Sequence, residues 1–481
     1  MRDQFGFAPA RILLAVPNHR RDLEGHALVA YHLVRHYGHE VVFSNIPDLE
    51  EAILRHAPDA LVLDRIDTRV RIARLAKSFG IRLAMLPTVG FTPDGTEIEA
   101  RRAGKLVSGE QLLDCCFTWG EQARENLLAH TTLMQVQVHT VGCPRFDCYS
   151  EPYLSLIEPR EAFLSRLGFA QPRAPLVVWA TNTYHSRTRQ TSKAIASAVA
   201  SGVPDAEIRD HLMHERAAFL ALAEATAVLA RRHAEWNFLI KLHPAETPDP
   251  YQEIANRTHN VALATDIRIR DVLYHSDALL ANCSTTATEA WMLGKPVFEV
   301  VGSSSVAMPP GYLASNHVIT RLSDLESLLQ AYLRAPRTAV PDAQRRARDE
   351  FLRRAYCRID GRASERCAAH LHQLVSSDGH AIDDQARIRA ACASAYAAWH
   401  AASARRLSNR IKSALALSRE TTLRFWRSDF WRFHRRPAEI WEEAVTPQMV
   451  QTLFEQFDRA HASRANAGDQ TNVVANVSHC G

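Results

Sequence analysis

Residues 278–296 read ALLANCSTTATEAWMLGKP, and this stretch has the clearest pattern of secondary structure in the chain. The apolar run Ala278–Ala281 is typical of a short strand that is buried on both faces. Thr286 and Glu289 have the spacing of a capping box, so we expect a helix to begin at Thr286. A second buried-strand pattern, Val297–Val301, follows that helix. A strand, a helix and a strand in this order predict a parallel α/β unit.

The same alternation of short apolar runs and helical segments extends outward through the chain. The other expected strands are Arg11–Val16, Val41–Phe43, Ala60–Leu63, Arg82–Leu86, Cys115–Thr118, Val136–Val141, Leu176–Ala180 and Asn237–Leu242. After the first strand we expect a polar loop, Pro17–Leu23, and a helix, Glu24–Tyr37, that Gly38 ends. A second long helix is expected at His211–Arg232.

These elements predict an α/β protein with two Rossmann-like domains and a cleft between them, plus a helical C-terminal extension. The expected segments are an N-terminal domain (1–150), a second domain (151–340), a helix that returns to the first domain (341–378), a basic, aromatic-rich helical extension (379–458) and a disordered tail (459–481).

Composition narrows the possible functions. The chain has 481 residues, 46% of them hydrophobic, and a net charge of +4, which is too balanced for a nucleic-acid partner. Its nine cysteines are irregularly spaced, with no C-x-x-C pair, so neither a disulfide framework nor a structural zinc site is expected. The N-terminus lacks an apolar signal region, and no apolar run reaches the roughly 20 residues of a membrane span. We therefore expect a cytoplasmic protein.

One strand ends in a motif that suits nucleotide binding. The motif reads Lys241-Leu242-His243-Pro244-Ala245-Glu246, and its proline stops the strand and exposes His243. The imidazole can bind a phosphate, and Glu246 can hold a ribose or a base. A solvated histidine beside a turn proline is the structural alternative.

Residues 278–296 contain a second such motif. The hydroxyls of Ser284, Thr285 and Thr286 stand at the expected start of a helix, where backbone N–H groups and the helix dipole favour phosphate. The alternative is a well-capped helix with a structural role only. Because both motifs follow strands of one domain, a single nucleotide site is favoured. Asn182, after another strand of that domain, and Thr183 are further candidates, with a polar turn as the alternative.

The loop after the first strand is expected to carry the acceptor chemistry. It contains His19, Asp22 and Glu24, and either carboxylate could act as the base of an inverting transfer or as the nucleophile of a double displacement. Acidic residues in the first turn of a helix are also favoured by the helix dipole alone. A second loop, Pro87–Gly95, is expected to help contact the acceptor.

The order of motifs resembles that of bacterial surface carbohydrate biosynthesis proteins over roughly residues 11–370. The motifs are PRFD at Pro144–Asp147, TN at Thr181–Asn182, the KLHPAE motif, and STTATEAWMLGKP at Ser284–Pro296. More distantly, the chain looks like GT-B transferases of CMP-linked Kdo and sialic acid, and like CDP-glycerol phosphotransferases. The resemblance implies that His243, Ser284, Thr285 and Thr286 hold the donor nucleotide. We expect the same nucleotide-binding site to include Pro244, Glu246, Glu289, Asn182 and Lys241. The resemblance also implies no cofactor and no metal, because no Asp-x-Asp motif follows a strand.

The segment 405–436 contains ten lysines and arginines against two acidic residues. Aromatic residues are interleaved with these charges: Phe425, Trp426, Phe430, Trp431 and Phe433. Such a helix suits an anionic membrane surface, which would place the protein peripherally at the inner membrane. The alternative is a helix that packs on the catalytic core.

Three functions follow from these patterns. The first is transfer of a sugar from a nucleotide donor, CMP-linked by the resemblance, onto a glycan or lipid-linked precursor of capsule or lipopolysaccharide. The second is nucleotide-sugar 2-epimerisation, which needs no acceptor. The third is a scaffold for glycan assembly without chemistry of its own.

Overall fold

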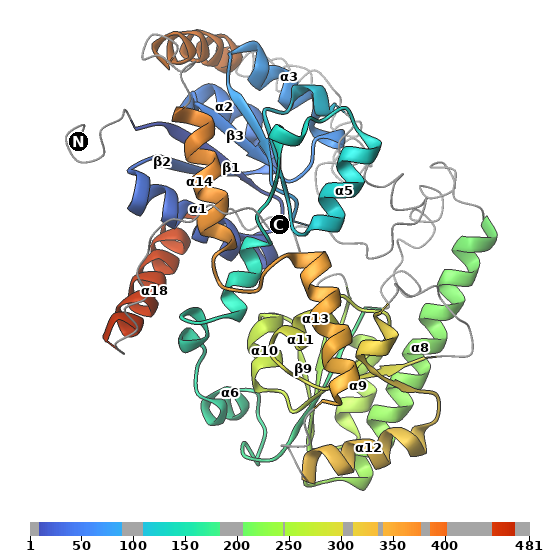
Figure 1. Cartoon of the computed structure of the whole chain (residues 1–481). Helices are drawn as coiled ribbons and strands as arrows, with labels where there is room; N and C mark the ends of the chain where they lie inside the picture. Colours follow the sequence, from blue (N-terminus) through green and yellow to red (C-terminus); the bar gives the residue numbers. More distant parts are fainter. Residues whose placement is uncertain are drawn as a thin grey trace, which may run out of the picture. The chain divides into compact units, whose positions relative to one another are not determined.

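The computed structural model describes residues 9–88, 109–182, 205–243, 246–301, 311–334, 340–376, 385–401 and 445–466. The chain divides into two compact units (Figure 1). Unit 1 comprises residues 1–91, 95–147 and 362–481, and unit 2 comprises residues 92–94 and 148–361. Each unit contains one six-stranded parallel sheet with helices packed on it.

Unit 1 is built on the strand order β2-β1-β3-β4-β5-β6. Its strands are β1 (Arg11–Val16), β2 (Glu40–Asn45), β3 (Ala60–Leu63), β4 (Arg82–Met85), β5 (Cys115–Thr118) and β6 (Val138–Thr140). Its helices are α1 (His19–Tyr37), α2 (Leu49–His56), α3 (Val70–Ser78), α5 (Glu121–His130), α14 (Ala363–Ser376) and α18 (Pro447–Asn466).

The two faces of the first sheet bury separate cores, because successive side chains of a strand point to opposite faces. Leu13 of β1 belongs to a core with residues of α2, α3 and α5. Its neighbour Leu14 belongs to a core with residues of α1 and α14. Figure 1 shows α14 and α18, from the last part of the chain, beside α1. Burial on both faces explains why these strands appear in the sequence as continuous apolar runs.

Unit 2 has the strand order β12-β11-β10-β7-β8-β9. Its strands are β7 (Leu176–Ala180), β8 (Asn237–Lys241), β9 (Val261–Ala264), β10 (Ala278–Ala281), β11 (Val297–Val300) and β12 (His317–Ile319). Its helices are α6 (Arg160–Arg166), α8 (Asp205–Arg232), α9 (Asp249–Asn256), α10 (Ile269–His275), α11 (Thr286–Met292), α12 (Leu322–Arg334) and α13 (Asp342–Tyr356). Single-turn 3-10 helices stand in several connections of the chain, such as η7 (Leu313–Ser315).

Each sheet has a point at which its strand order changes direction. In unit 1 that point is at β1, which pairs with β2 on one side and β3 on the other. In unit 2 it lies between β7 and β10, because the chain runs outward through β8 and β9 and then returns to β10. Ligands of open parallel sheets bind beyond the carboxyl ends of the strands at such points.

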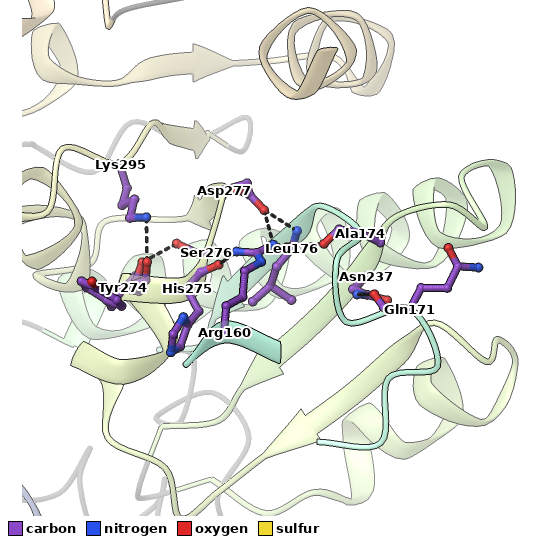
Figure 2. A network of polar contacts seen from close by, with 11 residues as sticks. Arg160, Gln171, Ala174, Leu176, Asn237, Tyr274, His275, Ser276, Asp277 and Lys295 are labelled. Carbon is purple, nitrogen blue, oxygen red and sulfur yellow. Dashed lines mark hydrogen bonds and ion pairs between the residues drawn. The ribbon is translucent and has the colours of Figure 1, made fainter. Parts of the chain in front are cut away.

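The strands that flank this point in unit 2 are tied together at their opposite, amino ends (Figure 2). The Asp277 carboxylate accepts a hydrogen bond from the backbone N–H of Leu176 (2.7 Å) and pairs with Arg160 (2.6 Å). Arg160 also donates to the carbonyls of Ala174 (3.0 Å) and His275. The network fixes the register of β7 against β10 and joins both to α6.

The α/β class with two Rossmann-like domains and a helical C-terminal region is confirmed. The expected helix Glu24–Tyr37 is wrong at its start, because α1 already begins at His19. Asn18 is the N-cap, and its side chain accepts a hydrogen bond from the backbone N–H of Arg21 (3.2 Å). The polar loop therefore shortens to Pro17–Asn18. At the other end, Gly38 has a φ of 62° and ends the helix as expected.

The returning helix expected at 341–378 is two helices, α13 in unit 2 and α14 in unit 1. Cys357 and Gly361 have φ values of 62° and 72°, which interrupt a right-handed helix. The second helix is capped by Asp147 of the PRFD motif. Its carboxylate accepts hydrogen bonds from the backbone N–H groups of Ala363 (2.8 Å) and Ser364 (2.7 Å) and from the Ser364 hydroxyl (2.5 Å).

The tail expected to be disordered from residue 459 continues as helix α18 through Asn466. Phe457 and Ala460 are buried, so packing stabilises this helix despite its polar sequence. Residues 467–481 lie outside the described part of the chain, as does the basic segment 405–436. No helix among the described residues has the length and hydropathy needed to cross a bilayer.

Candidate functional site

Thr181, the first residue after β7, links the two strand ends that the KLHPAE motif and the TN motif occupy. Its hydroxyl accepts a hydrogen bond from the backbone N–H of His243 (2.8 Å) and donates to the Glu246 carboxylate. Glu246 also accepts from the Tyr251 hydroxyl (2.7 Å). His243 and Glu246 are both half-buried. The structure therefore brings these two predicted residues together through Thr181, whose position directly before Asn182 was its only signal in the sequence.

Lys241, another predicted nucleotide-binding residue, is buried at the end of β8. Its ammonium group donates to the carbonyls of Leu242 (2.8 Å) and Thr265 (3.2 Å). These bonds fasten the end of β8 to the segment after β9. Pro244 and Thr183 lie outside the described residues.

Asn182 spans the point between β7 and β10 at which the strand order changes direction. Its side-chain amide donates to the carbonyls of Asn282 (2.7 Å) and Cys283 (3.4 Å). Asn282 in turn donates to the carbonyl of Val300 at the end of β11 (2.7 Å). Two amide side chains thus connect the carboxyl ends of three neighbouring strands. Asn182 therefore lies beside the residues that precede Ser284, Thr285 and Thr286, the STT motif.

Helix α11 begins at Thr286, as expected, but the expected capping box is wrong. Thr286 is the first helical residue, and its backbone N–H donates to the hydroxyl of Ser284 (3.2 Å). The Glu289 carboxylate accepts from the Tyr149 hydroxyl and is buried. Thr285 is exposed, and Thr286 is half-buried. The two threonine hydroxyls, rather than Glu289, are the accessible groups of the motif.

Behind this turn lies a buried polar cluster that sequence analysis missed. The Glu299 carboxylate of β11 accepts a hydrogen bond from the backbone N–H of Cys283, and its other oxygen lies 3.0 Å from the Tyr312 hydroxyl. The same hydroxyl contacts both the N–H and the carbonyl of Ser284, each at 3.1 Å. Burial raises the pKa of Glu299 to about 7. The one signal in the sequence was a charged residue within the apolar run VFEV.

Unit 1 contains a pocket formed by residues of α1 and of the segments that follow β4 and β6. The residues that line it are Asp22, Gly25, His26, Leu86, Pro87, Thr88, Cys143, Pro144 and Arg145. Gly25 is required here, because a Cβ atom would lie only 2.7 Å from the backbone nitrogen of Arg145. The guanidinium of Arg145 lies over the rings of Phe146 (4.8 Å) and Trp119 (5.9 Å).

Asp22 is the one predicted catalytic residue that lines this pocket. Its buried carboxylate accepts two hydrogen bonds from Arg21 (2.6 and 2.8 Å), and Arg21 reaches Thr88 (3.3 Å). The Asp22 backbone carbonyl accepts a hydrogen bond from Nδ1 of His26 (2.9 Å). His19 and Glu24 are half-buried on the first turns of α1. Sequence analysis missed His26, whose signal was its place one helical turn after Asp22.

Across the described ranges, no three histidine, cysteine, aspartate or glutamate side chains gather as a metal site would require. No protein-family model matches the chain, and no curated protein matches its sequence.

Solved structures do match. A Listeria monocytogenes protein described as a UDP-N-acetylglucosamine 2-epimerase is 13% identical, with a TM-score of 0.51, over 78% of this chain and 99% of that one. The UDP-GlcNAc 2-epimerase of Neisseria meningitidis, bound to UDP-GlcNAc, is 14% identical. The match covers 76% of this chain and 99% of that one, with a TM-score of 0.48. A glycosyltransferase from Rickettsia africae is 9% identical. The match covers 77% of this chain and 100% of that one, with a TM-score of 0.44. The first likeness shows that the chain shares the two-domain fold of the Listeria protein, and it shows the fold alone.

Proposed function

We propose that this protein is a glycosyltransferase that takes a sugar from a nucleotide donor and adds it to a precursor of surface carbohydrate. The observation that carries the proposal is the gathering of polar groups at one point of the unit 2 sheet. Asn182, the Cys283–Thr286 turn and the Thr181–His243–Glu246 cluster all follow neighbouring parallel strands. The resemblance of the sequence motifs favours a CMP-linked donor and a precursor of capsule or lipopolysaccharide.

In this proposal the donor nucleotide binds at the strand ends of unit 2. The accessible hydroxyls of Thr285 and Thr286, which follow β10, hydrogen-bond the phosphate. The His243 imidazole follows β8, and β7 lies between these two strands. Glu246, held by Thr181 and Tyr251, is suited to accept hydrogen bonds from ribose hydroxyls. Fixed donors of this kind stabilise the charge that develops on a leaving phosphate.

The acceptor binds in the pocket of unit 1, and His26 is the base that deprotonates its hydroxyl. Because a carbonyl oxygen only accepts, Nδ1 of His26 must carry the proton in its bond to Asp22. The neutral ring then has its lone pair on Nε2, which is the arrangement a general base needs. The Asp22 carboxylate is occupied by Arg21, so its role is to hold that guanidinium and the helix turn in place. Glu24 and His19 are the alternative bases.

The shared fold of the Listeria protein favours one alternative, nucleotide-sugar 2-epimerisation. The two activities differ in their products, because transfer releases free nucleotide and epimerisation does not. Segment 405–436 is proposed to hold the enzyme at an anionic membrane surface near its acceptor.

The first test is a thermal-shift screen against CMP-, CDP-, UDP- and GDP-linked ligands. A ligand that binds the folded state raises its stability, by about 2.7 kcal/mol at a hundredfold excess over Kd. We expect the melting temperature to rise with one nucleotide and the rise to be lost in the double variant Thr285→Ala, Thr286→Ala, which removes the two accessible hydroxyls. Equal stability with and without all four nucleotides would contradict the proposal. Conversion of UDP-GlcNAc without nucleotide release would establish the epimerase instead.

A further inference from the structure

Helix α18, from the last part of the chain, packs on α1 through a group of aromatic rings (Figure 1). Tyr31 of α1 is 7% exposed. Its ring contacts Phe454, Phe457 and His461 of α18, with centroid distances of 5.5, 5.7 and 5.7 Å. The His461 ring is stacked on Tyr31 and is nearly perpendicular to the ring of His32, at 6.4 Å. The contact between the two helices therefore includes an imidazole from each of them.

His32 is buried in this contact and lies between two other imidazoles. It is 4% exposed, and neither of its ring nitrogens has a hydrogen-bond partner among the residues that the structure describes. Its neighbours are His461 and, one turn further along α1, His36, whose ring centroid is 4.9 Å away. A buried charge without a partner is strongly unfavourable, and like charges at this distance repel each other. His32 must therefore stay neutral while α18 is docked on α1.

Other charged groups face the two histidines from all three helices that meet here. They are Arg35 and His36 of α1, Arg362 and Glu365 at the start of α14, and Asp458 and Arg464 of α18.

Both carboxylates of this set already pair with an arginine. Glu365 accepts two hydrogen bonds from Arg362 (2.8 and 3.0 Å), and Asp458 accepts from Arg35 and from the Tyr31 hydroxyl (2.8 Å). Burial outweighs their attraction for a proton. It lowers the pKa of His461, and it lowers the pKa of His32 from an ordinary 6.5 to about 3.

We propose that the contact between α18 and α1 is a pH-sensitive switch: α18 is docked at neutral pH and is released when His32 and His461 take up protons. In the released state both imidazoles reach water and titrate near their ordinary pKa. Because the docked state binds fewer protons than the released state, docking is strongest above pH 6.5 and weakens as the pH falls below it. Release uncovers apolar rings on both helices, and α1 also carries Asp22 and His26 of the unit 1 pocket.

The experiment measures hydrogen exchange of the α18 amides in the full chain at pH 7.5 and pH 5.5, corrected for the intrinsic rate. Between these pH values His32 alone should weaken docking about tenfold, because it stays neutral in the docked state. His461 adds a smaller factor. We therefore expect the protection of α18 in the wild type to fall by more than about tenfold.

Variants that cannot take up the proton separate the two contributions. His32→Phe keeps a ring in the same place, and the fall in protection should be about tenfold smaller than in the wild type. The double variant His32→Phe, His461→Phe should lose nearly all of the pH dependence. His32→Leu removes the same proton in a more flexible side chain, and it replaces His32→Phe if that variant does not fold. The matched control His130→Phe changes an exposed histidine of α5 and should follow the wild type.

The amides of α5 show whether release is local, because α5 packs on the opposite face of the sheet. They should be more protected than those of α18 at both pH values. Equal protection of the two helices would mean that α18 leaves only when unit 1 unfolds, and it would overturn the proposal. An equal fall in protection in the wild type and in the His32 variants would overturn it as well.

Discussion

His26 is the residue on which the proposed chemistry depends. We expect His26→Gln to lower the rate of transfer by about 10²- to 10⁴-fold, which is the usual contribution of a general base, and to leave donor affinity unchanged. His26→Gln keeps a hydrogen-bonding side chain but offers no ring nitrogen. Single-turnover rates and donor Kd values provide the measurement, with the exposed His130→Gln as the control. A larger loss of rate in Glu24→Gln than in His26→Gln would assign the base to Glu24.

Gly25 tests how closely α1 must approach Arg145. An alanine normally stabilises a helix interior by about 1 kcal/mol relative to glycine. Here the added Cβ would lie 2.7 and 2.9 Å from the backbone N and Cα atoms of Arg145. Because these are backbone atoms, a change of side-chain rotamer cannot remove the clash. We therefore expect Gly25→Ala to lower the free energy of unfolding by about 1–3 kcal/mol, as overpacking does. Urea denaturation would show it, and an unchanged or raised stability would mean that the helix can shift.

At the scale of elements, Asp147 controls the start of α14. Burial raises its pKa to about 6 from an ordinary 3.8, although the hydrogen bonds from Ser364 and Ala363 act in the opposite direction. Because the folded state then holds the proton more tightly than the unfolded state, folding stability falls as pH rises from about 4 to 6 and is constant above. The shift corresponds to about 3 kcal/mol.

The variant Asp147→Asn removes this titration. We expect it to be less stable than the wild type, because its amide group faces two N–H donors, but to lack the fall between pH 4 and 6. Urea denaturation across that range compares the two slopes. If the wild type and Asp147→Asn have the same pH dependence, the carboxyl is ionised throughout and its hydrogen bonds outweigh its burial.

Most strands could be predicted from the sequence, whereas the two edge strands of unit 2 could not. Arg11–Val16, Ala60–Leu63 and Leu176–Ala180 have the expected bounds, because burial on both faces leaves continuous apolar runs. The two missed strands, β9 and β12, are the edges of their sheet and are partly exposed. Short, half-exposed strands lack a distinctive pattern.

The candidate site was predictable only where its residues are local in sequence. The KLHPAE and STT motifs follow strands, so their meeting at one sheet edge could be expected. The pairing of Glu299 with Tyr312, and of Asp22 with the pocket around Arg145, depends on contacts between distant segments. Periodicity and spacing do not specify such contacts.

At the scale of the whole molecule, the packing of the C-terminal helix α18 means that membrane binding cannot be tested by truncating the chain. Helix α18 packs against α1, and Tyr31 of α1 hydrogen-bonds Asp458 (2.8 Å), so removing the C-terminal part would uncover unit 1. Charge reversal avoids this problem. We expect Arg427→Glu, Arg432→Glu and Arg435→Glu together to weaken binding to anionic vesicles by at least about two orders of magnitude, at about 1 kcal/mol for each basic residue lost.

The matched control reverses three exposed arginines of α13, namely Arg346, Arg353 and Arg354. Binding should also fall with salt, because the attraction of exposed charges is screened. Vesicle sedimentation at two salt concentrations gives the comparison. Equal losses in both triple variants would mean that net charge alone, rather than segment 405–436, attracts the membrane.

Unit 1 is formed from both ends of the chain, and this division sets the order in which the two units can fold during synthesis. Cys367, Ala368 and Leu371 of α14 complete the core that Ile12 and Leu14 begin, and α18 covers α1 still later. Unit 2 has all its residues once Gly361 has been synthesised. The middle of the chain can therefore fold before α14 is available to pack against the first strands of unit 1. During that interval the apolar face of α1 is uncovered, and a nascent chain that stalls after unit 2 leaves it open to chaperones and to aggregation.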